Sequence, residues 1–102
     1  MKPIFLLTPL VLVCQLVAGD LPDDVAALQR GQPKEVRLFI ERVFLCHHWA
    51  GEEPYSQARA KQINEAVQKL RCDQLPSDEA RLRKKYKSNP KVLAALDSAK
   101  AL

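Results

Sequence analysis

The residues best suited to chemistry lie close together, between His47 and Arg59. Two histidines, two acids, the only tryptophan of the chain and a tyrosine surround a glycine and a proline there. Histidines and acids can ligate a metal or move protons, whereas aromatic side chains serve as anchors in protein interfaces. We therefore take this segment as the main place to look for function, and its candidate residues are His47, His48, Trp49, Glu52, Glu53, Tyr55 and Arg59.

Two interpretations of this segment stay open, and they do not exclude each other. In the structural interpretation, Trp49 and Tyr55 cover the edge of the core, and Glu52 or Glu53 pairs with Arg59. In the recognition interpretation, all seven candidate residues form a partner-binding surface, because connecting segments held by a scaffold often carry function.

A metal site is the alternative for the same region. Cys46, His47 and His48 are consecutive, and an acid such as Glu52 is close in sequence. Consecutive residues of a helix point in different directions, so this spacing is poor for ligands, and a disulfide would remove Cys46 from the set. We expect no metal or other cofactor, and keep a metal-binding protein as the alternative function.

Catalysis is disfavoured by the residue pattern. No candidate nucleophile stands beside a recognisable base, and a nearby histidine and glutamate are too common to define an active site. A chain of short helices this small also rarely encloses a substrate pocket. We expect a protein that is not an enzyme.

A basic stretch between Arg81 and Lys87 is the second chemical feature, with five cations in seven residues. It could hold an anionic lipid head group or an acidic partner. However, Leu82 and Tyr86 are spaced to face a core together, which leaves the cations in water. We favour a solvated helix face, and the stretch lacks the broad apolar face needed for membrane insertion.

The first residues of the chain predict a cleavable signal peptide. Lys2 precedes an uncharged apolar run from Ile4 to Ala18, which is too short to span a bilayer comfortably. Small residues follow, so we place cleavage after Gly19 and a single domain at 20–102. A lipoprotein modified at Cys14 is less favoured, because Val13 rather than a small residue precedes that cysteine. These features predict a periplasmic or secreted protein.

After removal of residues 1–19, the chain has 83 residues and two cysteines, Cys46 and Cys72. A domain of this size is only marginally stable without a crosslink, and an oxidising compartment supplies one. We expect a Cys46–Cys72 disulfide. The formal charge falls from +4 to about +3 with Lys2 removed, which does not indicate nucleic-acid binding.

Hydrophobic periodicity and the glycine and proline residues at helix boundaries predict an all-α fold of about four to five short helices closed by that disulfide. The first helix starts around Pro22 and ends at Gly31, and Pro33 opens the second. The second helix is the most apolar and should be central. Its inward positions are Val36, Phe39, Ile40, Val43, Phe44 and His47.

The remaining helices are predicted from their capping residues. Ser56, Ser77 and Asn89 are expected to cap the third, fourth and fifth helices. Cys72 then lies at the far end of the third helix, which is roughly 24 Å long at 1.5 Å per residue. Because bonded cysteines have Cα atoms within about 7 Å, residues 47–55 must travel along much of that helix.

Together these features favour a non-enzymatic protein-binding module with a protein partner in the envelope or outside the cell. An inhibitor or immunity-type protein is one concrete version. The sequence is also compatible with a homo-oligomer. We expect no nucleic-acid partner and no stable membrane insertion once the signal peptide is removed.

Overall fold

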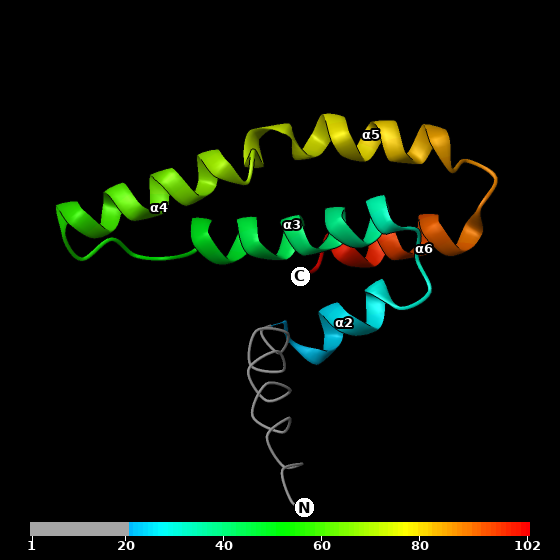
Figure 1. Cartoon of the computed structure of the whole chain (residues 1–102), viewed down its shortest axis with the longest axis horizontal. Helices are drawn as coiled ribbons and strands as arrows, with labels where there is room; N and C mark the ends of the chain where they lie inside the picture. Colours follow the sequence, from blue (N-terminus) through cyan, green and yellow to red (C-terminus); the bar gives the residue numbers. More distant parts are fainter. Residues whose placement is uncertain (1–20) are drawn as a thin grey trace, which may run out of the picture.

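The computed structural model describes residues 21–102, and the predicted signal peptide, with Cys14, lies outside that range. Residues 21–102 contain no strand, which confirms the all-α prediction (Figure 1). Five α-helices and one short 3₁₀ turn follow in order: α2 (Asp23–Gln29), α3 (Lys34–Ala50), α4 (Gln57–Lys69), η2 (Cys72–Gln74), α5 (Leu75–Lys85) and α6 (Pro90–Ala99).

Helix α3 is the central element, as its apolar pattern predicted. It contacts α2, α4, η2, α5 and α6. In Figure 1 it runs through the middle of the molecule, with α4 and α5 in a row along one side and α2 on the other, while α6 overlaps α3 in this view. The buried positions of α3 recur at three- and four-residue spacing, so they form one stripe; they are Val36, Phe39, Ile40, Val43 and Cys46.

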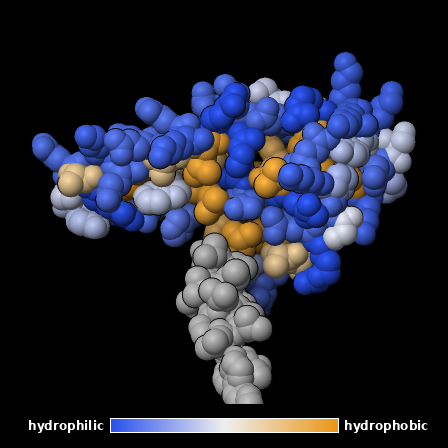
Figure 2. All heavy atoms as spheres, viewed as in Figure 1, coloured by the Kyte–Doolittle hydropathy of each residue, from blue (hydrophilic) through white to orange (hydrophobic). Residues whose placement is uncertain are grey.

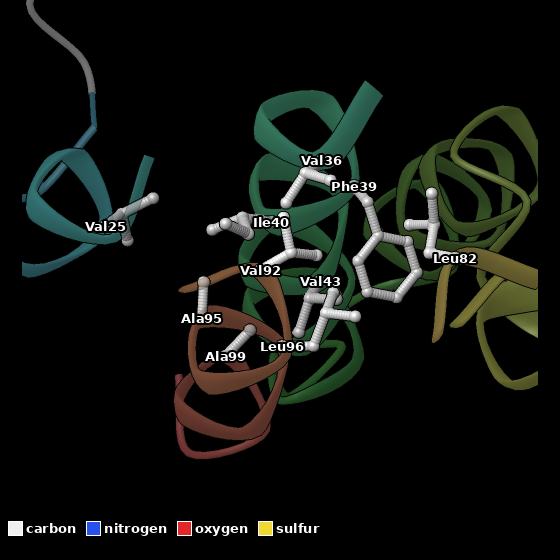
Figure 3. Close-up of a cluster of buried hydrophobic side chains, with 10 residues drawn as sticks. All are labelled: Val25, Val36, Phe39, Ile40, Val43, Leu82, Val92, Ala95, Leu96 and Ala99. Carbon is white, nitrogen blue, oxygen red and sulfur yellow. The ribbon is translucent and has the colours of Figure 1, made fainter. Parts of the chain in front are cut away.

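The hydrophobic core lies at one end of this arrangement. Its side chains come from α2, α3, α5 and α6, and Ile40 and Leu82 are among its largest fully buried members (Figure 3). No residue of α4 belongs to it. The core residues are Val25, Val36, Phe39, Ile40, Val43, Leu82, Val92, Ala95, Leu96 and Ala99.

Local capping signals set several helix ends. The Oγ atom of Ser56 accepts a hydrogen bond from the backbone N–H of Arg59 at 3.1 Å, and Asn89 Oδ1 accepts one from Val92 at 3.2 Å. Both predicted caps are confirmed. Gly31 follows α2 with a φ of +76°, a left-handed conformation that glycine adopts without steric cost.

The predicted cap at Ser77 is wrong. Helix α5 begins at Leu75, and Pro76 occupies its first turn. Ser77 is already helical, and its hydroxyl donates to the carbonyl of Gln74 at 3.0 Å. The 3₁₀ turn η2 ends at Gln74 and α5 follows it directly at Leu75, so the helix starts before the serine.

The disulfide prediction is confirmed, with the Cα atoms of Cys46 and Cys72 5.7 Å apart. The predicted course of the connection is also right, because α4 starts well beyond the end of α3 and returns alongside it (Figure 1). Its conformation differs from the prediction: α3 continues to Ala50, so residues 47–50 are helical and only 51–56 form the connection. Gly51 is where the helix ends.

The chain bends between α4 and α5, next to Cys72, and Arg42 of α3 binds this bend. Its guanidinium donates to the carbonyls of Leu70 and Arg71, at 2.9 and 3.0 Å, and to Asp78 Oδ2 at 2.9 Å. The last carbonyls of a helix lack partners within it, and Arg42 supplies a donor to that of Leu70, which caps α4. The carbonyl of Arg71 accepts from the backbone N–H of Gln74 as well. We call the Cys46–Cys72 bond together with the Arg42 contacts the bend clamp.

We predict that the disulfide contributes about 3–4 kcal/mol to the free energy of unfolding, because closing a loop of this size restricts the unfolded chain. Urea unfolding of the oxidised protein and of the Cys46→Ser/Cys72→Ser variant, followed by circular dichroism, measures the difference. Equal midpoints and slopes would contradict the prediction.

Helices α3 and α5 are joined by a polar cluster around Glu35. Its carboxylate accepts from Tyr86 Oη at 2.7 Å and pairs with Lys85 and Arg81. The hydrogen bonds from Lys85 and then Tyr86 lower the pKa of Glu35 from 4.5 to about 2. Tyr86 also packs against the core, as its spacing from Leu82 predicted.

This pKa shift predicts that the free energy of unfolding decreases as the solution becomes acidic. Because the pKa of Glu35 is lower in the folded state, its contribution is present above pH 4.5 and is lost as the pH falls toward 2. The Glu35→Gln variant should therefore lose less stability than the wild type between pH 5 and pH 2, in urea unfolding at stepped pH. Glu41→Gln on the same helix is the control. A wild-type and a Glu35→Gln curve that fall in parallel would contradict the assignment.

Candidate functional site

The end of α3 and the start of α4 are joined by an ion pair between Glu52 and Arg59. Arg59 Nη2 lies 2.7 Å from both carboxylate oxygens, and its Nε donates to Oε1 at 3.1 Å. The Ser56 cap starts α4 so that Arg59 falls in its first turn. The hydrogen bond to Glu52 raises the pKa of Arg59 above its usual value, so the guanidinium stays charged.

Trp49 lies beneath this ion pair. The guanidinium carbon of Arg59 is 5.1 Å from the centroid of the indole ring, a cation–π distance. The indole is half-buried. Trp49, Glu52 and Arg59 therefore form a cluster that satisfies its own charges and fixes the connection between α3 and α4.

His48 borders this cluster on α3. Its ring stacks on Phe44, with centroids 6.2 Å apart, and meets the edge of Trp49 at 6.0 Å. Its Nε2 lies 3.8 Å from Glu52 Oε2 and the side chain is largely exposed. A protonated His48 would add a second cation beside Glu52.

His47 belongs to a different region. Its Nδ1 lies 3.0 Å from the carbonyl oxygen of Leu102, and the side chain lines a cavity of about 190 Å³ between α3, α5 and α6. The two histidines thus diverge, as consecutive helix residues do. Cys46 is in the disulfide, and within residues 21–102 no three His, Cys, Asp or Glu side chains gather as metal ligands.

Glu53 and Tyr55 do not join the cluster. The Tyr55 residue is 81% exposed, so the expectation that it covers the core edge is wrong. Glu53 is exposed as well. The structure therefore brings four of the seven candidate residues together and presents Tyr55 at the tip of the connection.

The sequence predicted helix α4 with its Ser56 cap, but it did not predict that this helix buries no residue. None of its residues is buried, and its larger apolar side chains, Ile63 and Val67, are only half-buried. We call residues 48–69 the arm, since α4 makes its main contacts with α3 and η2 alone. Figure 2 shows mainly hydrophilic residues along α4. A signal was present in the sequence, because α4 has only these two large aliphatic residues.

The basic stretch on α5 is largely paired. Arg83 donates to Glu79 at 2.8 Å and to Asp97 at 2.7 Å, while Arg81 and Lys85 both pair with Glu35. Within this stretch three of the five cations therefore neutralise carboxylates of the same chain. This arrangement agrees with the interpretation of the stretch as a solvated helix face.

Comparisons of the chain with protein-family models, with curated proteins and with solved structures found no match. In the part of the chain that the structure describes, no helix is both long and apolar enough to cross a membrane.

The cluster predicts a spectroscopic effect of Arg59. Replacement of Arg59 by alanine uncovers the indole of Trp49 and frees Glu52, so the tryptophan emission should shift to longer wavelength and the ring should become more accessible to the neutral quencher acrylamide. Lys61→Ala on the same helix is the control and should leave the emission unchanged. An Arg59→Ala spectrum identical to that of the wild type would show that the cation does not cover the ring.

Proposed function

We propose that the chain is an exported, non-enzymatic protein-binding module and that its arm is the contact surface. The observation that carries this proposal is Tyr55, which is 81% exposed next to a connection fixed by the Glu52–Arg59 ion pair. A large exposed aromatic side chain on a fixed segment is a typical binding anchor. The arm therefore supplies both an anchor and its support.

Preorganisation supports the same proposal. The Ser56 cap, the Glu52–Arg59 ion pair and the bend clamp each restrict the arm before any partner is present. A surface that is already ordered loses less conformational entropy when it binds. We therefore expect the partner to meet the arm largely as the structure has it.

The shape and composition of the arm favour one type of partner. The arm is narrow and ends in a single aromatic anchor, and its exposed side chains are mainly polar, among them Gln57, Gln62, Asn64 and Gln68. Such a surface complements a concave site with an apolar pocket and a polar rim. An envelope enzyme whose cleft takes up Tyr55 fits this description, which is the inhibitor or immunity-type version of the proposal.

The cellular location is part of the proposal. The predicted signal peptide at residues 1–19 supports export to the periplasm or the exterior. The Cys46–Cys72 disulfide supports it independently, because such bonds persist mainly in oxidising compartments.

The proposal predicts a position-specific crosslink in living cells. The photoreactive residue p-benzoylphenylalanine resembles tyrosine and replaces Tyr55 in one strain. In a second strain it replaces Lys87, an exposed residue at the other end of the molecule. Position 55 should give one discrete crosslinked protein, which mass spectrometry identifies, and position 87 should not. The purified partner should then bind the Tyr55→Ala variant at least several-fold more weakly than the wild type.

The other outcomes count against the proposal. No crosslink at position 55, or the same products at both positions, would mean that the arm is not a specific contact. A product with twice the mass of the chain would replace the foreign partner with a homo-oligomer. Circular dichroism of Tyr55→Ala serves as the folding control.

A further inference from the structure

A cationic cleft lies at the bend between α4 and α5, away from the tip of the arm. Its volume is about 400 Å³. Four cations and one acid line it, together with one leucine: Arg42, Lys69, Leu70, Arg71, Asp78 and Arg81. The cleft therefore carries a formal charge of +3, as large as the net charge expected for the whole chain after cleavage at Gly19.

The cations of this cleft differ in how far they are already neutralised. Arg42 is paired with Asp78 in the bend clamp and donates to two backbone carbonyls as well, which takes three of its five N–H donors. Arg81 reaches Glu35 at 3.3 Å, but that carboxylate also pairs with Lys85, and the Arg81 side chain is 58% exposed. Arg81 therefore keeps donors that face solvent.

Lys69 and Arg71 are open. Within residues 21–102 neither has an ion-pair partner, and the one side-chain hydrogen bond of Arg71 goes to the neutral amide oxygen of Gln74 at 3.2 Å. Cations held together without an anion repel one another, and the low-dielectric wall of a cleft makes that repulsion larger than on a flat surface. An anion bound there would relieve it.

The backbone brings Arg71 to the cleft in an unusual way. Its φ of 56° and ψ of 48° place it in the left-handed region, and no other non-glycine residue in the described range has a positive φ. Glycine or asparagine is the usual residue at such a position. The chain instead places an arginine there, at the point where α4 gives way to η2.

We propose that this cleft binds a phosphate-bearing anion with more than one negative charge, a diphosphate or a related phosphoryl group. The forked donors of Arg71 and Arg81 match the oxygens of a phosphoryl group, and Lys69 adds a point charge. One carboxylate would leave most of the +3 charge unbalanced, whereas a diphosphate balances it. Of the cleft residues only Lys69 belongs to the arm, at the end away from Tyr55, so this site does not rest on the protein contact proposed for Tyr55.

Calorimetric titration of the oxidised protein with sodium pyrophosphate at low ionic strength tests the proposal. We expect saturable binding of one ion per chain that weakens as salt is added. Arg71→Gly removes the cation and suits the left-handed backbone, so it should fold at least as well as the wild type. Arg71→Gly and Lys69→Gln should each weaken binding about tenfold, and the double variant should abolish it.

Two controls make the test specific. Lys61→Gln makes the same change as Lys69→Gln on the same helix but outside the cleft, and should change the affinity less than twofold. Citrate carries a similar charge on carboxylates and should bind much more weakly than pyrophosphate. No saturable binding at millimolar pyrophosphate, an equal loss in Lys61→Gln, or equal binding of citrate would each overturn the proposal.

A second arm of the experiment identifies the source of the phosphate. Vesicles of phosphatidic acid, whose phosphomonoester head group can carry two negative charges, are mixed with phosphatidylcholine and compared with pure phosphatidylcholine in a sedimentation assay. Binding to the anionic vesicles that Arg71→Gly abolishes would assign the cleft to a lipid head group. Pyrophosphate binding without vesicle binding would assign it to a soluble phosphate.

Discussion

The structure depends on how the bend between α4 and α5 is fastened to α3. Helix α4 buries no residue, so hydrophobic packing alone does not hold it in place. The Cys46–Cys72 bond ties the chain just after α4 to α3 covalently, and Arg42 donates to the carbonyls of Leu70 and Arg71 at the end of α4. Without this clamp, the contacts of Arg59 with Glu52 and Trp49 would hold the start of α4, but its far end would lose its attachment to α3.

The bend clamp separates two parts of the molecule that are stabilised by different interactions. At one end, α2, α5, α6 and the first half of α3 share a core that includes Ile40 and Leu82. At the other end, the arm is held by polar and aromatic contacts such as that between Arg59 and Trp49. A small chain can thus hold an exposed segment rigid without the apolar residues that a larger core would need.

The two proposed sites lie at different distances from the clamp. Tyr55 lies at the tip of the arm, where the connection turns into α4. The cationic cleft lies at the bend itself, and Arg42 belongs both to the clamp and to the cleft wall. Because Arg42 is already paired with Asp78, an anion in the cleft would be attracted mainly by Lys69, Arg71 and Arg81.

Sequence reasoning succeeded where the deciding interactions are local or unambiguous. The caps at Ser56 and Asn89 depend on residues within three positions. The disulfide followed because only two cysteines remain after the predicted cleavage. The central role of α3 followed from its apolar stripe.

The features that the sequence did not predict correctly have a common physical cause. Each depends on contacts with residues outside its own neighbourhood in the sequence. Ser77 has the right chemistry for a cap, but η2 had already started α5 before it. The exposure of Tyr55 follows from where the connection runs, and its residue type suited burial equally well. Arg42 joins residues 28 to 36 positions away, and no pattern in its own neighbourhood signals that contact.

Amide hydrogen exchange of the oxidised protein, resolved by residue, tests the central claim most directly. If the clamp holds an arm that lacks a core, amides of α4 should exchange through a local opening that costs less free energy than global unfolding. Amides of α3 before Phe44 and of α6 should exchange only through global unfolding. On reduction of the disulfide, exchange in α4 should accelerate far more than in α6. Equal protection of α4 and α6, or equal acceleration on reduction, would contradict the account.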